Sequence, residues 1–184
     1  MPKNKKIRPI IQDGDPVLRK TPPELPLPEI TSRRIQDIIH EMSESLYSSA
    51  NGIGIAAPQI GYSLPIFLIS EEAMQKPGAP HNHEAGKRHW KHFVFINPKL
   101  IKSSQKKELL DEGCLSVDGV YGRVRRARQV TVEAYNEKGG KFRVGASGLY
   151  AQALQHEMDH LNGVLFIDKA EAVEPISKIL PPAR

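Results

Sequence analysis

The chain has 184 residues, a single cysteine and a formal net charge of +5. No apolar run approaches the roughly 20 residues that cross a bilayer, and a lone cysteine excludes an internal disulfide, which favours a reducing compartment. The basic start, Met1 to Lys6, is not followed by the apolar stretch of a secretory signal, so we expect a cytoplasmic location and no membrane partner. The length suits a single domain that spans residues 1–184.

A helix is predicted from about Thr31 to Ser48, with Thr31 and Ser32 as N-cap candidates. Its apolar residues recur at helical spacing: Ile35, Ile38, Ile39, Met42 and Leu46. The next segment, Gly52-Ile53-Gly54-Ile55-Ala56-Ala57, formally matches a dinucleotide-binding fingerprint, but that fingerprint must follow a strand and open a helix. Because a helix precedes it and Pro58 would interrupt one after it, the glycines are better explained by close approach of the backbone to a ligand.

Strands are predicted at 65–70 and 93–97, and again at 130–135 and 141–144, where residues 136–140 form a hairpin turn. Residues 71–92 are interpreted as a surface insertion within the single domain, because Pro, Gly, His and Lys dominate them. The sequence His81-Asn82-His83 could bind a metal, but a surface loop is the favoured interpretation of this stretch.

The single cysteine lies in Glu112-Gly113-Cys114-Leu115-Ser116. A free cysteine is most often a small buried apolar residue. The flanking glycine and acid indicate instead a bent, partly polar segment. Both interpretations of Cys114 stay open at this point.

The sequence His156-Glu157-Met158-Asp159-His160 has the pattern H-E-x-x-H. It is framed by apolar residues, by Ser147 as an N-cap candidate and by Gly163 as a C-terminal stop, which predicts a core helix of about four turns. Residues four apart share a helix face, so His156 and His160 could bind one metal ion. Glu157 beside them could handle the proton of a water molecule. The bare pattern also occurs by chance on solvated helices.

A catalytic site of this kind usually needs a third protein ligand. The metzincin pattern would place a histidine at 166, but the chain has Phe166, which cannot bind an ion. Downstream, the acids Asp168, Glu171 and Glu174 follow a short strand predicted at 164–167. Upstream, Cys114 is the candidate.

Three segments together make the chain resemble the peptide deformylases. They occur in the family's order, and the resemblance covers roughly residues 8–170. It implies an α+β fold in which antiparallel β-sheets pack around a central C-terminal helix that carries H-E-x-x-H. The segments are Gly52 to Gln59, Glu112 to Ser116 and Gln155 to Gly163.

The resemblance implies a metal-dependent hydrolase that removes the formyl group from the N-terminal methionine of new polypeptides and releases formate. One divalent ion would be iron(II) in cells, with zinc, nickel or cobalt as substitutes, and its ligands would be Cys114, His156 and His160. Glu157 would take a proton from water and pass it to the leaving amine. The side-chain amide of Gln59 and the backbone N–H of Leu115 would donate hydrogen bonds to the oxyanion.

The resemblance also implies that backbone groups of Ile53 and Gly54 pair with an extended peptide, as in strand addition. Leu149 and Ala153 share the helix face of His156. They would line an apolar pocket for methionine, or belong only to the core.

Glu112 and Arg126 match positions that pair and brace the cysteine segment; the alternative is two unrelated surface charges. Two positions depart from the family pattern. Asp118 stands where the family often has proline, and Tyr121 stands where an arginine commonly faces the substrate entrance.

The implied partners are N-formyl-methionyl nascent polypeptides and the ribosome surface, which a positive net charge would favour; no DNA is expected. Two rival hypotheses remain open. An endopeptidase of the general H-E-x-x-H type is disfavoured by Phe166, and a non-catalytic deformylase-like binding protein is disfavoured by the presence of Glu157.

Overall fold

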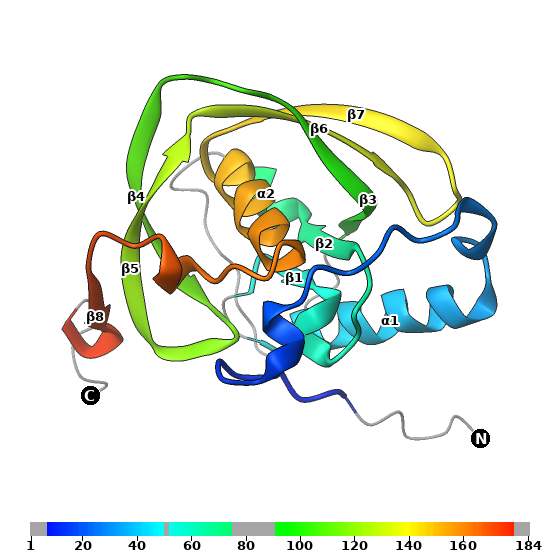
Figure 1. Cartoon of the computed structure of the whole chain (residues 1–184), viewed down its shortest axis with the longest axis horizontal. Helices are drawn as coiled ribbons and strands as arrows, with labels where there is room; N and C mark the ends of the chain where they lie inside the picture. Colours follow the sequence, from blue (N-terminus) through cyan, green and yellow to red (C-terminus); the bar gives the residue numbers. More distant parts are fainter. Residues whose placement is uncertain (1–6, 50–51, 75–90, 179–184) are drawn as a thin grey trace.

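The computed structural model describes residues 7–49, 52–74 and 91–178. The predicted insertion at 71–92 therefore lies outside the described residues except at its ends. Helices and strands follow in the order shown in Figure 1: α1 Arg33–Ser48, β1 Gly54–Ala56, β2 Ile66–Ser70, β3 His92–Ser103, β4 Lys107–Cys114, β5 Val117–Ala127, β6 Gln129–Tyr135, β7 Lys141–Ser147, α2 Gly148–Leu161 and β8 Val173–Pro175. Short 3-10 helices lie at Pro16–Arg19, Leu27–Glu29, Ala57–Ile60, Glu71–Met74, Phe166–Asp168 and Ile176–Lys178.

The strands form two antiparallel sheets. The larger has the order β1-β2-β3-β6-β7 and the smaller the order β4-β5-β8. Figure 1 shows both sheets curving around α2, which lies between them. The predicted α+β class, with antiparallel sheets around a central helix that carries H-E-x-x-H, is confirmed.

Strand β2 is buried along its whole length and supplies side chains to two cores. Phe67 and Ile69 belong to a cluster that includes the apolar face of α2, whereas Ile66 and Leu68 belong to a cluster that includes the apolar face of α1. Side chains alternate between the two faces of a strand. The larger sheet is thus covered by one helix on each face.

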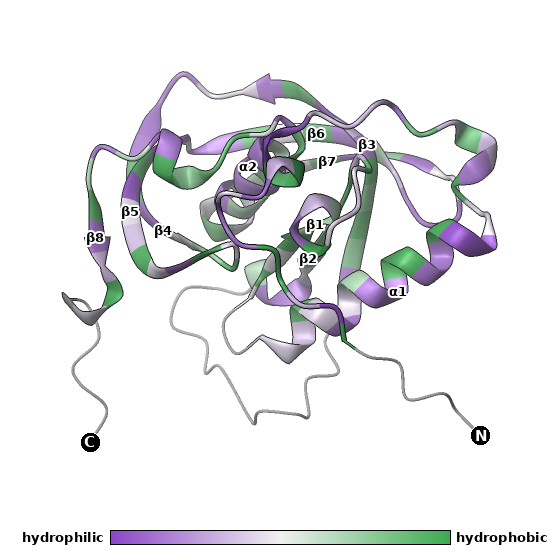
Figure 2. Ribbon diagram, turned by 60° about the horizontal axis from the view of Figure 1, so that its bottom comes forward, coloured by the Kyte–Doolittle hydropathy of each residue, from purple (hydrophilic) through white to green (hydrophobic). Residues whose placement is uncertain are grey.

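Helix α1 follows the predicted pattern closely. The Ser32 hydroxyl accepts the N–H of Ile35 at 3.4 Å, so the N-cap is Ser32, one of the two predicted candidates. The five apolar residues of the predicted spacing are all buried, and Figure 2 shows hydrophobic and hydrophilic residues alternating along α1. In the described part of the chain, no helix is long and apolar enough to cross a bilayer.

Helix α2 begins after Ser147, although the Ser147 side chain makes no capping hydrogen bond. Gly163 follows its end with a φ of 70°, a conformation that favours glycine. A Cβ atom at this position would lie 2.6 Å from the carbonyl oxygen of Arg19. Glycine is therefore needed both for the turn and for the close approach of the chain.

The strand predicted at 164–167 is wrong. The chain instead enters a 3-10 helix at Phe166–Asp168, because the Asp168 carboxylate accepts the N–H of Leu165 at 2.8 Å and closes a turn. The long hairpin β4–β5 was not predicted. Its strands carry many charged residues and few alternating apolar ones.

Candidate metal centre

The structure brings the three predicted metal ligands together. Cys114 ends β4, while His156 and His160 lie one turn apart on α2. The Sγ atom of Cys114 lies 3.2 Å from Nε2 of His160, and one donor atom from each of the three residues falls within 4.8 Å of the others. One ion could therefore contact all three.

The hydrogen bonds around these side chains fit a cation. The Cys114 sulfur accepts the N–H of Ser116 at 3.3 Å and the Nε2 group of Gln59 at 3.5 Å, as a thiolate ligand would. Nδ1 of His156 lies 3.1 Å from Oε2 of Glu112, which leaves Nε2 free to bind. A carboxylate on the far nitrogen of a ligand histidine is a common feature of metal sites.

The electrostatic surroundings of the two histidines differ. Burial opposes a charge on His156, but its hydrogen bonds to Cys114 and Glu112 and the negative charges of Cys114 and Glu157 raise its pKa well above the ordinary value. Burial, together with the positive charges of His156 and Arg126, lowers the pKa of His160 well below that value. The cluster therefore attracts positive charge while it keeps one imidazole neutral. A thiolate with two imidazoles is a set of ligands that suits zinc or iron(II).

Glu157 lies beside the cluster and is only 3% exposed. Burial raises its pKa to about 7. Its Oε2 atom has no hydrogen-bond partner among the described residues. The carboxylate is packed against β1, since a Cβ atom at Gly54 would lie 2.4 Å from Oε1 of Glu157. Gly54 thus leaves the space that the carboxylate occupies.

A buried charge network holds Glu112 in place. Arg126 donates to both Glu112 oxygens at 2.7 and 2.8 Å and to Asp159 at 2.5 Å, and Lys169 reaches Asp159 at 2.6 Å. Burial alone would raise the pKa of Glu112, but the hydrogen bonds with Arg126 and His156 outweigh it and lower the pKa to about 2. The predicted pair of Glu112 and Arg126 is therefore formed and is almost wholly buried.

Gln59 is buried, and its amide is oriented by two neighbours. Its Oε1 accepts the N–H of Ala56 at 2.8 Å, and its Nε2 donates to the Ser116 hydroxyl at 3.1 Å and approaches Cys114. The amide N–H₂ group therefore faces the cysteine. Leu115 follows Cys114 in the turn between β4 and β5, and its carbonyl accepts from Gln12 at 2.9 Å. The predicted role of the Leu115 N–H stays a prediction.

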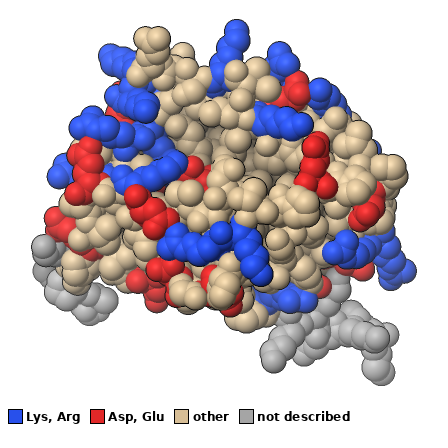
Figure 3. Space-filling model, viewed as in Figure 1, with Lys and Arg blue, Asp and Glu red and all other residues tan. Residues whose placement is uncertain are grey.

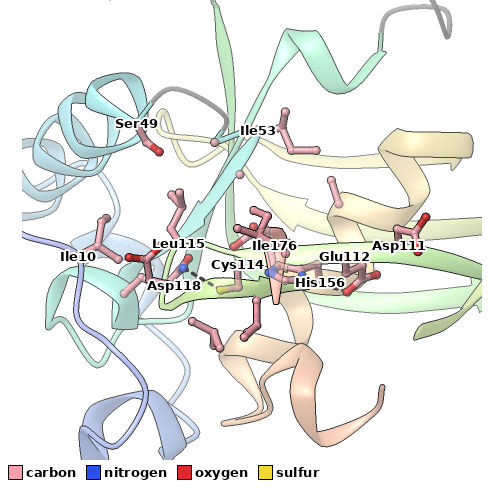
Figure 4. Close-up of a pocket in the computed structure, with 18 of the residues that line it drawn as sticks. Ile10, Ser49, Ile53, Asp111, Glu112, Cys114, Leu115, Asp118, His156 and Ile176 are labelled. Atoms are coloured by element: carbon pink, nitrogen blue, oxygen red, sulfur yellow. Dashed lines mark hydrogen bonds and ion pairs between the residues drawn. The ribbon is translucent and has the colours of Figure 1, made fainter. Parts of the chain in front are cut away.

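These residues border an open cavity of about 650 Å³ (Figure 4). All four predicted substrate-binding residues line it: Ile53, Gly54, Leu149 and Ala153. Ala153 also belongs to the core, whereas Leu149 is 41% exposed. Asp118 lines the cavity, while Tyr121 lies on β5 opposite Glu174 and is not among the lining residues.

Strand β1 presents an open edge to this cavity, because in the described part of the chain it pairs only with β2. The Ile53 carbonyl accepts the N–H of Ser70 at 2.8 Å and so points toward β2. Backbone groups alternate in direction along a strand, so the N–H and C=O of Gly54 point to the open edge.

The residues of the competing interpretations have other contacts in the structure. The Phe166 ring packs against His156 with centroids 6.5 Å apart, and Asp168 and Glu171 form ion pairs with Arg19 and Arg125. The glycines at 52 and 54 border β1 and do not open an α-helix. The His81-Asn82-His83 stretch lies outside the described residues.

Several residues of the site had no predicted role. Ser116 and Gln155 stood inside quoted motifs: Ser116 contacts Gln59 and Cys114, and the Gln155 amide pairs with both backbone groups of Ala127. Asp159 is a variable position of H-E-x-x-H, and its contact with Arg126 has no local signal. Ile176 lines the cavity from a segment distant in sequence.

Comparison with known proteins supports one family. The family model for polypeptide deformylase matches residues 7–175. The chain is 43% identical to peptide deformylase 1A, chloroplastic, of Solanum lycopersicum over 87% of its own length and 58% of that protein. It is 41% identical to the peptide deformylase of Halothermothrix orenii over 85% of its length and 88% of that protein. The matched region spans 58% and 60% of two plant relatives, so these are longer proteins.

Solved structures similar to this chain belong to the same family. A peptide deformylase from Synechococcus elongatus in complex with actinonin has a TM-score of 0.76 at 38% identity, covering 91% of this chain and 83% of that one. The peptide deformylase from Thermotoga maritima has a TM-score of 0.75 at 29% identity, covering 91% and 99%.

Proposed function

The chain belongs to the polypeptide deformylase family, and from this premise we propose that it hydrolyses the formyl group from the N-terminal methionine of newly made polypeptides and releases formate. One observation carries the proposal. Cys114, His156 and His160 converge beside the buried carboxylate of Glu157, at the wall of an open cavity.

Members of this family are metalloenzymes, and the residues present suit a divalent ion. We propose that Cys114, His156 and His160 hold iron(II), for which zinc, nickel or cobalt can substitute. When bound, the ion supplies Lewis-acid polarisation of the formyl oxygen and makes water more acidic. Elemental analysis of protein purified without added metal identifies the native ion.

Glu157 moves the proton. Its carboxylate takes a proton from the attacking water and later gives it to the leaving amine, so that formate and a free amino terminus are the products. The packing of Glu157 against Gly54 supports this role, because it holds the carboxylate beside the residue whose backbone would pair with the substrate.

Two donors stabilise the oxyanion that develops as the formyl carbon is attacked. They are the Gln59 amide and the Leu115 N–H. A preorganised donor of this kind contributes about 3 kcal/mol to barrier lowering. The hydrogen bond from Ala56 to Gln59 supports the assignment, because it turns the amide N–H₂ group toward Cys114. Glu112 and Arg126 act indirectly, by fixing the ring of His156.

The substrate binds as an added strand on the open edge of β1, where the N–H and C=O of Gly54 are its backbone partners. The expected pairing with Ile53 is not kept, because the Ile53 carbonyl points toward β2; Ile53 lines the cavity instead. Main-chain pairing depends little on the sequence of the substrate, which suits an enzyme whose substrates are many different new chains. The methionine side chain occupies the apolar wall formed by Leu149 and Ala153 of α2. The exposed surface of Leu149 supports this placement.

We propose a reducing cytoplasmic location, where nascent chains are made and a cysteine ligand stays reduced. The ribosome surface is a proposed partner. Figure 3 shows Lys and Arg side chains over β4 and β5, with carboxylates among them. Such a mixed surface, on a chain whose formal net charge is +5, supports weak, salt-sensitive contact with an anionic partner.

Formate release tests the activity. Protein prepared anaerobically with iron(II), nickel or cobalt should release formate from formyl-Met-Ala-Ser and should not cleave the unformylated peptide. Cleavage inside casein-like chains would instead support an endopeptidase. Binding of the formylated peptide with no formate released would overturn the proposal and favour a non-catalytic binder.

A further inference from the structure

The described residues after α2 return along β5 and reach the cavity. We call residues 170–178 the C-terminal segment. Its strand β8 pairs with β5 in the register Val120↔Pro175, Tyr121↔Glu174 and Gly122↔Val173, and the N–H of Glu171 donates to the Arg123 carbonyl at 2.9 Å. Figure 1 shows β8 as the outer strand beside β5.

Two features bring the C-terminal segment close to β5. Arg125 pairs with Glu171 at 2.6 Å. Gly122 removes a steric block, because a Cβ atom there would lie 2.8 Å from the carbonyl oxygen of Ala172 and 2.9 Å from the Cβ of Ala170. A larger residue at Gly122 would push the C-terminal segment outward.

Ile176 follows β8 directly and lines the cavity. It is 43% exposed, although it is a large apolar residue. Val120, which pairs with the neighbouring Pro175, lines the same wall. Figure 4 shows Ile176 reaching the region of Cys114 and His156, which belong to β4 and α2. The apolar surface of Ile176 is thus uncovered at the place where the proposed peptide would lie.

The geometry points to Ile176 as a specificity-determining residue that contacts the side chain of the second residue of the substrate. This inference rests on the proposed function. In an extended chain, successive side chains point to opposite sides. When the methionine side chain points to the wall of Leu149 and Ala153, the next side chain points away from that wall. We infer that it meets Val120 and Ile176, the lining residues supplied by β5 and by the residue after β8.

The consequence is a preference for large apolar residues at the second position. Covering the surface of Ile176 removes apolar area from water, as does covering the substrate side chain. Truncating Ile176 to alanine removes the equivalent of one or two methyl contacts, which corresponds to a change of about 4- to 15-fold in kcat/KM.

The test compares formyl-Met-Leu-Ser with formyl-Met-Gly-Ser as substrates of the full-length, metal-loaded protein. The wild type should favour the leucine peptide, and Ile176→Ala should lower the leucine-to-glycine ratio of kcat/KM by about 4- to 15-fold. Ile176→Val should keep most of the preference. Val173→Ala is the matched control, because Val173 is 45% exposed on the same segment but does not line the cavity; its ratio should equal that of the wild type.

The outcomes separate the two proposals. No formate release by the wild type from any formylated peptide would overturn the proposed function and this inference with it. Formate release without a leucine preference, or an equal loss on both peptides in Ile176→Ala, would overturn the inference alone. Peptides with norleucine in place of the first methionine provide a further check. If Ile176→Ala alters only the preference between methionine and norleucine at the first position, the inference is also overturned.

Discussion

The metal centre and the outer wall of its cavity are built in opposite ways. At the centre, the side chains of Glu112 and Arg126 are each 3% exposed and are joined by two hydrogen bonds, and they also contact His156 and Asp159. At the outer wall, Ile176 is nearly half exposed, and it belongs to a segment attached mainly by strand pairing and one exposed ion pair.

This difference separates the residues proposed for catalysis from the residue proposed to set substrate preference. Charged groups without water must be paired, so the centre tolerates little change and holds its ligands in one geometry. The wall faces water and can vary at small cost. Substitutions should therefore have effects that fall steeply from the centre to the surface.

The largest effect is expected for Glu157→Gln. Removing the proton acceptor while keeping the shape should lower kcat by about 10²- to 10⁴-fold. Metal content should stay near that of the wild type, because Glu157 is not one of the three proposed ligands. Formate assays and elemental analysis measure the two quantities on the same sample.

Glu24→Gln is the matched control for Glu157→Gln, since Glu24 is an exposed acid that pairs with Lys99 on another surface. It should retain wild-type activity. More than a tenth of wild-type kcat in Glu157→Gln would contradict the assigned proton transfer.

The next largest effect concerns stability. Arg126→Met removes the buried cation that pairs with both Glu112 and Asp159, so the free energy of unfolding should fall by about 3–5 kcal/mol. Arg125→Met is the control, because Arg125 is the neighbouring residue on the exposed face and its ion pair has side chains 61% and 46% exposed. Its effect should stay below about 1 kcal/mol. Denaturant unfolding measures both, and similar losses in the two variants would refute the buried-network argument.

A residue of this centre could be predicted from the sequence when the residues it acts with are close to it in the chain. His156, Glu157 and His160 are close in sequence, so their spacing on a helix could be deduced directly. Cys114 required the resemblance to a family, because β4 brings it to α2 from 42 residues away. The contact of Asp159 with Arg126 and the approach of Ile176 depend on the packing of separate segments, for which the local sequence carries no signal.

The fold shows the same division. Helix α1 was predicted to within two residues, since its apolar spacing and its Ser32 cap are local features. The hairpin β4–β5 was missed because its strands are stabilised by cross-strand pairs, and their sequence does not alternate between apolar and polar residues. The Glu112 and Arg126 pair belongs to that hairpin, and it was predicted from the resemblance to the family and not from the local sequence.

An intermediate effect is expected for Gly54→Ala, at the boundary between the centre and the open edge. The added Cβ would meet Oε1 of Glu157 at 2.4 Å, so the carboxylate must move. A displacement of about 1 Å in a catalytic group costs roughly 10²-fold in rate. Gly145→Ala is the control, because nothing lies within 4 Å of a Cβ at that position. Wild-type kcat in Gly54→Ala would show that Glu157 is not held by this contact.

The smallest effect is expected at the surface, for Asp168→Asn. Burial raises the pKa of Asp168, but the Leu165 N–H and Arg19 outweigh it and lower that pKa below the ordinary value. A carboxyl with a lowered pKa stabilises the fold above its unfolded pKa and loses that contribution as the pH falls through its folded pKa. The side chains of this pair are both 39% exposed, so the contribution should not exceed about 1 kcal/mol.

The difference in unfolding free energy between the wild type and Asp168→Asn should therefore be present at neutral pH and disappear as the pH falls through the lowered pKa of Asp168. Asp37→Asn is the control, because its pair with Arg33 is 3.8 Å long and highly exposed, and it should change stability little at any pH. A loss at neutral pH as large as that of Arg126→Met would mean that burial does not govern these charges, and the contrast between centre and surface would fail.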